Sequence, residues 1–395
     1  MIPAFLFLLA AYSIMWLWIK KFNSPEFYSV SDRYSSIDGL RGYLALMVFL
    51  HHSCTWYFYV HTGTWKVPPS NIYTNFGEGG VAIFFMVTGF LFFSKLIRSV
   101  DSGLDWGRLF ISRFMRLAPL YIFATCMVFV IVFYMSGGVL RSEPGKLLGG
   151  MLRWLCLGVF SVPDLNGIEQ SWMMVAGVTW SLRYEWLFYF ALPAFAFVLR
   201  VAVPVKYLIV GCLGLIFLLA SAFRDERIYC LTLFACGAVS ALLVHLKFLK
   251  KISNSWPASC LVALLFAVAF LGFESTYRIV PIVLLAVAFL LVASGNSLFG
   301  LFDAPVSKAL GELSYGIFLL HGLVLFVGLK LLIGIDVLRG FSVIEFWLTV
   351  VVLVPVVVIF GIFVFKYIEK PGMNAVPFVI GKIRSYSGDR RNAVV

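Results

Sequence analysis

The chain has 395 residues, of which 62% are hydrophobic and only 13% charged, and its formal net charge is +12. This composition excludes an ordinary soluble domain and indicates a protein that crosses a lipid bilayer several times. The basic residues lie between apolar stretches, where they set the orientation of membrane helices. The positive charge therefore does not indicate a nucleic-acid partner.

Apolar stretches long enough to span a bilayer predict an all-α membrane helix bundle. None of the connections between them has the composition of a separate soluble domain. We expect eleven such helices, near residues 3–19, 41–60, 79–95, 117–137, 176–198, 205–222, 228–246, 257–273, 279–294, 315–335 and 342–365.

The distribution of lysine and arginine predicts the orientation of the bundle. If the N-terminus lies outside, the connections on the cytoplasmic side hold most of these residues, as the positive-inside rule requires. We therefore expect a periplasmic N-terminus and a cytoplasmic C-terminus. The longest outward connection, residues 138–175, contains an apolar patch at 147–162 that predicts an interfacial or re-entrant helix.

The second apolar stretch carries charged and titratable residues that are expensive inside a membrane. On a helix, Arg41 and His52 lie about 20° from a common face and about 16 Å apart along the axis. A cation at the membrane surface and a deep imidazole suit a site that holds an anionic group and does proton chemistry. Adjacent His51 points about 100° away and is expected to pack against a neighbouring helix.

More modest interpretations of this stretch remain open. His52 is also compatible with a packing role, in which its ring binds a neighbouring carbonyl. Asp38 and Arg41 are spaced i, i+3 and are compatible with an interfacial ion pair that caps the start of the helix.

Three other stretches add candidate site residues. Arg113 and Arg116, expected on the side of Arg41, are compatible with phosphate binding or with plain topology signals. Glu185, in an aromatic segment, is compatible with orienting a histidine, with binding a hydroxyl, or with an interfacial pair with Arg183. His321 is a second intramembrane histidine, for which packing is again an alternative.

Taken in order, these motifs resemble the acyltransferase family 3 integral membrane proteins. The resemblance covers about residues 36–371, with departures at Thr88, where serine is usual, Arg183, where a small residue is common, and Phe318, where tyrosine is common. It is carried by Asp38-Gly-Leu-Arg41-Gly with His52, Gly80 to Phe90, Arg113/Arg116/Pro119/Tyr121, Trp180-Ser181-Leu182 with Glu185 and Phe188-Tyr189, Gly311 to His321, and Ile368-Glu369-Lys370-Pro371.

The resemblance implies ten core helices preceded by one extra N-terminal helix. Its domains would be an N-terminal helix and cytoplasmic connection in 1–35, an acyltransferase domain in 36–371 and a cytoplasmic tail in 372–395. It also implies a bacterial inner-membrane O-acyltransferase that moves an acetyl group from cytoplasmic acetyl-CoA to a sugar hydroxyl. The acceptor would be a surface glycan such as O-antigen or its lipid-linked precursor, and no metal is expected.

The expected roles follow from this chemistry. Arginines would hold the CoA phosphates, and His52 would act as base or take the acyl group transiently. Two other functions use the same polar residues: a proton-coupled transporter of a glycan or lipid precursor, and a scaffold in which they only pack helices. The candidate residues are His52, Glu185 and Asp38 for catalysis, Arg41, Arg113 and Arg116 for the donor, and Trp180, Ser181, Tyr315 and His321 as substrate-binding or supporting residues.

Overall fold

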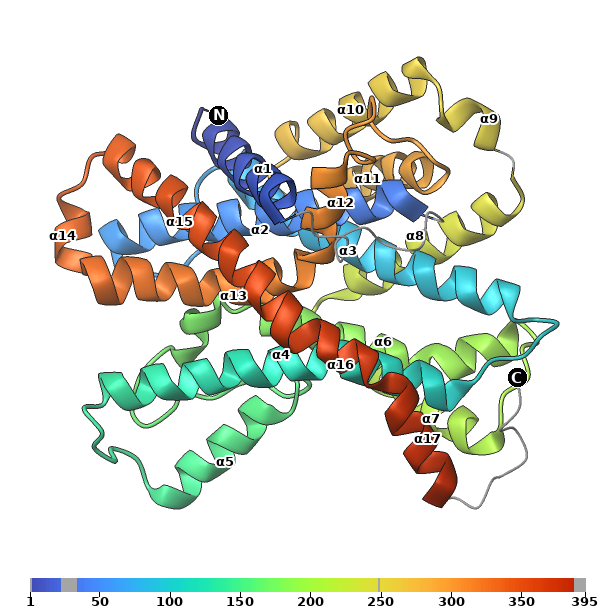
Figure 1. The fold of residues 1–395 in the computed structure, drawn as a ribbon, viewed down its shortest axis with the longest axis horizontal. Coiled ribbons are helices and arrows are strands. Elements are labelled where there is room, and N and C mark those ends of the chain that lie inside the picture. The colour runs from blue at the N-terminus through green and yellow to red at the C-terminus, as the bar shows by residue number, and fades with distance from the viewer. Residues whose placement is uncertain (1, 23–33, 248, 387–395) are drawn as a thin grey trace.

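A computed structural model describes residues 2–22, 34–247 and 249–386, and these are almost entirely helical (Figure 1). No strand occurs among the described residues, apart from one isolated bridge between Leu165 and Ile168. The predicted all-α class is confirmed. Most of the predicted connection within 1–35 and the end of the predicted tail, residues 387–395, lie outside the described residues.

Each of the eleven predicted stretches overlaps a helix. The early helices reach further than predicted, because polar residues at their ends continue the same helical hydrogen bonding. The helices are α1 Ile2–Phe22, α2 Ser35–Thr62, α3 Asn71–Arg98, α4 Trp106–Met135, α6 Thr179–Val198, α7 Val205–Arg224, α8 Ile228–His245, α10 Trp256–Leu271, α11 Ile279–Ala293, α13 Ser314–Leu325 continued by η4 Phe326–Ile333, and α15 Val343–Val364.

Seven segments of the described chain are long and apolar enough to cross a membrane, which makes this a multi-pass membrane protein. Helices α2 and α6 do not qualify, although they are long, because they carry much of the polar sequence discussed above. Helices α10 and α11 are apolar but shorter. The seven segments are Pro3–Lys21, Asn71–Arg98, Trp106–Met135, Val205–Arg224, Ile228–His245, Ser314–Ile333 and Val343–Ser385.

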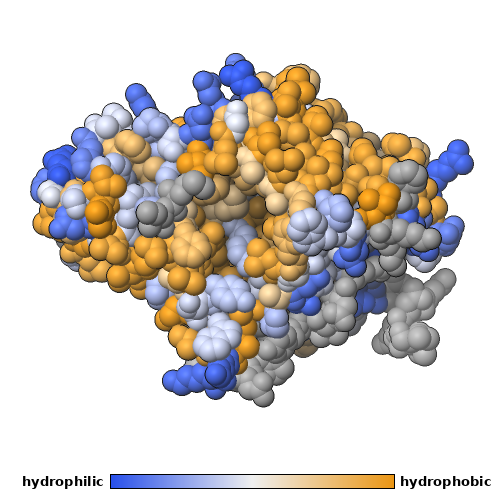
Figure 2. All heavy atoms as spheres, turned by 90° about the horizontal axis from the view of Figure 1, so that it is seen from above, coloured by the Kyte–Doolittle hydropathy of each residue, from blue (hydrophilic) through white to orange (hydrophobic). Residues whose placement is uncertain are grey.

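The surface agrees with a membrane environment. Large hydrophobic side chains such as Phe133 and Leu332 are 67% and 78% exposed, which water would disfavour and lipid would not. Figure 2 shows broad hydrophobic areas on one face of the molecule, with hydrophilic side chains gathered toward the margins.

Short helices connect the long ones. α5 (Pro144–Leu155) lies within the predicted outward connection and buries only Gly150 and Trp154, while Leu148 and Leu152 are exposed. That one-sided burial fits the predicted interfacial helix. The others are η3 Ser171–Val175, α9 Lys250–Ser253, α12 Pro305–Glu312, α14 Ile335–Arg339, η5 Phe365–Glu369, α16 Lys370–Asn374 and α17 Val376–Tyr386.

Helix α2 lies at the centre of the bundle and packs against α3, α12 and α13. Most of its side chains are buried, including those on either side of the two histidines. Near the C-terminus, α16 and α17 continue from the end of α15 and cross α4, close to the place where Arg384 forms a 2.7 Å ion pair with Asp105 (Figure 1). A central helix with partners on several sides is suited to hold a buried site.

Candidate active site

The glycines near Asp38 and Arg41 are required by close packing of α2 against α12 and against the turn that precedes α12. A Cβ atom on Gly39 would lie 1.9 Å from the carbonyl oxygen of Phe302, and one on Gly311 would lie 1.9 Å from that of Asp38. Only glycine permits backbones to approach this closely. These contacts fix the first turns of α2 and therefore the position of Arg41.

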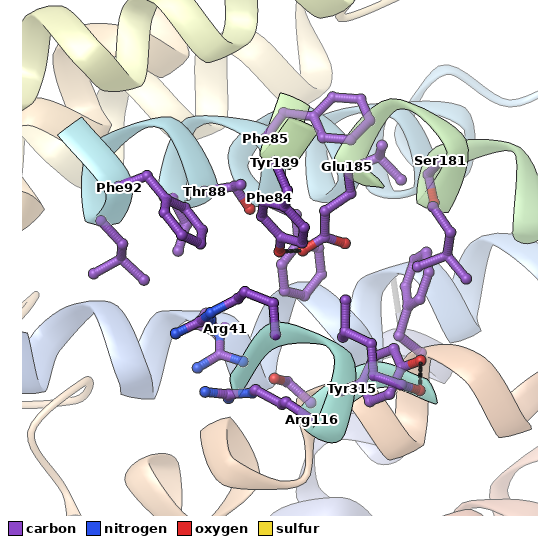
Figure 3. Close-up of a pocket in the computed structure, with 18 residues that line it drawn as sticks. Arg41, Phe84, Phe85, Thr88, Phe92, Arg116, Ser181, Glu185, Tyr189 and Tyr315 are labelled. Atoms are coloured by element: carbon purple, nitrogen blue, oxygen red, sulfur yellow. Dashed lines mark hydrogen bonds between the residues drawn. The ribbon is translucent and has the colours of Figure 1, made fainter. Parts of the chain in front are cut away.

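Arg41 lies in a pocket that also receives side chains from α3, α4, α6 and α13 (Figure 3). We call it the arginine pocket; its volume is about 110 Å³. Arg41 and Arg116 lie side by side in Figure 3, and Glu185 and Tyr189 enter from α6. The pocket brings together six of the candidate residues, namely Arg41, Arg113, Arg116, Ser181, Glu185 and Tyr315.

Several polar groups at this pocket have no hydrogen-bonding partner among the described residues. The Nε of Arg113 is buried and unpaired, and its guanidinium lies 5.0 Å from the centre of the Phe92 ring. The hydroxyl oxygen of Ser314, which also lines the pocket, is buried and unpaired as well. Buried polar groups are normally satisfied, so a pocket that leaves a guanidinium nitrogen unpaired suits an anionic ligand.

The remaining polar contacts hold the walls in place. Arg41 forms the predicted i, i+3 pair with Asp38, with 3.5 Å between Nη1 and Oδ1. The hydroxyl of Tyr315 donates to the backbone carbonyl of Leu117 at 2.9 Å. Asp38 itself is not among the residues that line the pocket.

Glu185 and Arg183 do not form the interfacial pair that the sequence left open. The hydroxyl of Tyr189 donates to Glu185, whereas Arg183 forms an ion pair with Asp225 at 3.2 Å. Residues two apart on a helix point about 200° from each other, so the two side chains enter different parts of the molecule. Trp180 shares the side of Arg183 and lines a second pocket, described below.

The arginine pocket is elongated. Along α3 it extends from Val81 to Phe92, eleven residues or about 16 Å. Arg113 stands at the Phe92 end. At the opposite end, the rings of Phe84 and Phe318 meet with centroids 5.8 Å apart. One end is therefore cationic and the other aromatic.

A pair of histidines lies beyond the aromatic end. His52 Nδ1 and His321 Nε2 are 3.0 Å apart, and the Phe318 ring is centred 6.3 Å from that of His321. His321 is fully buried. Neither histidine lines the arginine pocket, whereas Phe318, whose ring neighbours that of His321, does. Helix α2 therefore places Arg41 in the pocket and His52 beyond its aromatic end.

The hydrogen bonds of the pair assign its protons. His321 Nδ1 lies 3.0 Å from the carbonyl oxygen of Ile317, which only accepts, so this nitrogen carries a hydrogen. In a neutral ring His321 Nε2 is then an acceptor, and His52 Nδ1 must donate to it. His52 Nδ1 also lies 3.0 Å from the Val48 carbonyl. His52 Nε2 is therefore the nitrogen with the free lone pair.

His51 makes separate contacts. Its Nδ1 lies 2.9 Å from the backbone oxygen of Tyr73, and a Cβ atom on Gly77 would lie 2.5 Å from its ring. The ring is therefore packed directly against the backbone of α3. This geometry is the one expected of a packing histidine.

Residues 34–366 match the family model described as an acyltransferase domain. The chain belongs to acyltransferase family 3. No curated protein and no solved structure matches it significantly. Membership makes the protein a membrane acyltransferase with an acyl donor and an acceptor. Helix α1 precedes the matched residues, and Glu369 follows them.

The candidate site also contains residues to which the sequence assigned no role. Tyr189 and Ser314 stand in quoted motifs, but whether they line the arginine pocket depends on which helices meet. Trp65, whose ring is stacked over that of His52 at 6.4 Å, lies after α2 in a connection with no helical pattern. Only the tertiary structure shows that it adjoins the histidine.

Proposed function

We propose that this protein is an inner-membrane O-acyltransferase that moves an acetyl group from cytoplasmic acetyl-CoA to a sugar hydroxyl. The acceptor would be a surface glycan such as O-antigen or its lipid-linked precursor. One observation carries the proposal: an elongated pocket with arginines at one end and a histidine pair directly beyond the other. A CoA thioester matches this arrangement, because its anionic phosphates lie far from its reactive thioester.

The elongated shape of the arginine pocket, with arginines at one end, gives the bound donor a direction. The phosphates would lie against Arg41, Arg113 and Arg116, and only the narrow arm that carries the thioester would extend along α3. The acyl carbon would then reach Phe84 and Phe318, next to the histidines.

The proposed chemistry balances with His52 as general base. Its Nε2 takes the proton of the attacking hydroxyl, the new ester C–O bond forms, the thioester C–S bond breaks, and the proton passes to the CoA sulfur. His321 acts through His52, because it accepts the Nδ1 hydrogen and keeps Nε2 free. The same nitrogen would be the nucleophile if the acyl group rested on the enzyme.

The two carboxylates with expected catalytic roles lie elsewhere. Asp38 is fourteen residues from His52 along α2, or about 21 Å, and Glu185 is hydrogen-bonded to Tyr189. We infer that Asp38 positions Arg41 and that Glu185 balances the positive charge of the arginine pocket. Direct catalytic roles for both remain predictions.

The decisive experiment is thioester turnover by the purified protein in lipid nanodiscs. With acetyl-CoA and an acceptor glycan, free CoA and acetylated sugar should form in equal amounts. Counterflow of the glycan without thioester cleavage would instead support the transporter. The membrane orientation is tested separately with reporters fused after Val395. A reporter that works only in the cytoplasm should be active there, and one that works only in the periplasm should be inactive.

A further inference from the structure

A second pocket, lined by residues from η3, the start of α6 and the turn between α7 and α8, has no part in donor binding as proposed above. Its volume is about 650 Å³, and it is more open than the arginine pocket. We call it the tryptophan pocket, because the indoles of Trp172 and Trp180 form part of its wall. Gly158 to Val162 close another side.

The tryptophan pocket is positively charged. Three arginines and one carboxylate line it: Arg183, Arg224, Arg227 and Asp225. Burial opposes ionisation of Asp225, but hydrogen bonds from Arg224 and Tyr184, together with nearby positive charge, hold the pKa of this carboxyl below its usual value. At neutral pH the four groups therefore carry a net charge of about +2.

The arginines differ in how they are used. Arg183 already has partners within the protein. It donates to the Val159 carbonyl and to Ser161, each at 2.9 Å, and forms an ion pair with Asp225. Arg227 has its guanidinium 4.4 Å from the centre of the Trp180 ring. Among the described residues Arg227 makes no side-chain hydrogen bond or ion pair, so its donors are available to a ligand.

The tryptophan pocket adjoins the histidine pair. The ring of Trp172 lies 6.0 Å from that of Trp65, which is stacked over His52 at 6.4 Å. On the other side, a Cβ atom on Gly322, next to His321, would lie 2.4 Å from the backbone of Val175 in η3. The pocket wall is thus built directly on the helix that carries His321.

We propose that the tryptophan pocket binds the acceptor, and that this acceptor is a glycan unit with an acidic group. Indole rings can stack on the apolar face of a sugar ring, and a guanidinium binds a carboxylate or phosphate with charge-assisted hydrogen bonds. Trp172 and Trp180 supply the indole rings for stacking, and Arg227 supplies the guanidinium. The acid group belongs either to the sugar itself or to the diphosphate of a lipid-linked precursor.

This inference rests on the proposed function, since it gives the acceptor of that reaction a place and a chemical class. The hydroxyl to be acylated would approach His52 from the side of Trp65, while the thioester approaches from the side of Phe318. Donor and acceptor would then meet at one imidazole from two separate pockets.

The test is binding of matched sugars to the full-length protein in nanodiscs, measured by isothermal titration calorimetry. Cellobiouronic acid and cellobiose differ by one carboxylate, and inorganic diphosphate reports the phosphate alone. We expect the wild-type protein to bind the acidic disaccharide about 10-fold more tightly than the neutral one. Diphosphate that binds in an Arg227-dependent way would support the lipid carrier as the source of the charge.

Arg227→Gln should abolish most of the preference for the acidic disaccharide, and Trp172→Leu should weaken both disaccharides. Arg278→Gln is the matched control, because Arg278 is an exposed arginine at the start of α11 that does not line the tryptophan pocket. Equal affinity of the wild-type protein for the two disaccharides, or an unchanged preference in a folded Arg227→Gln protein, would overturn the inference.

CoA binding, measured on the same preparations, separates this inference from the proposed function. If the wild-type protein binds CoA but shows no Arg227-dependent sugar binding, the acceptor site is wrong and the donor site stands. If it binds the acidic sugar but neither binds CoA nor cleaves acetyl-CoA, the proposed acyltransferase mechanism fails and the sugar site remains.

Discussion

The arginine pocket and the histidine pair are adjoining regions of one site, both supplied by α2, but their polar groups are satisfied very differently. The histidines form a continuous hydrogen-bonded series from Ile317 through His321 to His52. The pocket leaves Arg113 Nε and the Ser314 hydroxyl buried without partners among the described residues. If His52 is the base, as proposed, it is already in place before the reaction, whereas the unpaired donors would gain their partners from a ligand.

This comparison predicts that substitutions in the two regions change different kinetic constants. Changes in the histidine pair should lower the rate constant for transfer and leave donor affinity intact. Changes in the arginine pocket should weaken donor binding and leave the chemical step largely unaffected.

The largest effect is expected for His52→Ala. Removing a general base typically costs 10² to 10⁴ in rate, and removal of a nucleophile would cost more. His51→Ala is the matched control, since its ring packs against α3 and its loss should lower stability more than turnover. Initial acetyl-transfer rates per folded molecule, measured for both variants, show which histidine is needed for the reaction. A near wild-type rate for His52→Ala, or an inactive but folded His51→Ala, would contradict the assignment.

Arg113→Ala should weaken CoA binding by about one to two decades, because a charge-assisted hydrogen bond contributes roughly 1.5–3 kcal/mol. The control is Arg153→Ala, because Arg153 is an exposed arginine on α5 that does not line the arginine pocket. Equilibrium binding of CoA to each variant gives the answer. If Arg41→Ala, Arg113→Ala and Arg116→Ala all bind CoA like the wild type, these arginines serve membrane topology only.

Gly311→Ala should destabilise the fold by about 1–3 kcal/mol, because its new Cβ atom would overlap the backbone of Asp38 and push α2 away from α12. Gly149→Ala in α5 is the control, since nothing lies within 4 Å of a Cβ atom there. Thermal unfolding in nanodiscs measures both variants. Equal melting temperatures would mean that the two helices do not approach as closely as described.

The sequence predicted the helices well because each contains a long, mostly apolar stretch. It also identified Arg41, Arg113, Arg116 and Glu185, which the structure brings into one pocket. Polar residues in apolar stretches are rare enough to be recognised one by one. The sequence did not predict which helices contact each other.

Two examples show why the rest needed the tertiary structure. Arg41 and His52 share a face of α2 within about 20°, yet Arg41 lines the arginine pocket and His52 does not. The rings of Phe84 and Phe318, from α3 and α13, meet at the end of the pocket nearest the histidines. The tryptophan pocket joins η3, α6 and the turn before α8, segments whose residues Trp172 and Arg227 look like ordinary loop residues in sequence. Neither contact follows from the periodicity of any one helix.

The smallest effect is expected for Asp38→Asn, and it tests the comparison most directly. Asp38 touches Arg41 at 3.5 Å and is 24% exposed, a geometry for which ion pairs contribute only about 0.2–1 kcal/mol. The KM for acetyl-CoA should therefore rise up to about fivefold while kcat stays nearly unchanged. Asp38→Glu, which keeps the charge, should recover part of the loss. If Asp38→Asn instead lowered kcat as far as His52→Ala does, with KM unchanged, Asp38 would belong to the chemical step despite lying about 21 Å along the helix from His52. The two regions would then act as one catalytic unit, and the division between a binding pocket and a preorganised base would be wrong.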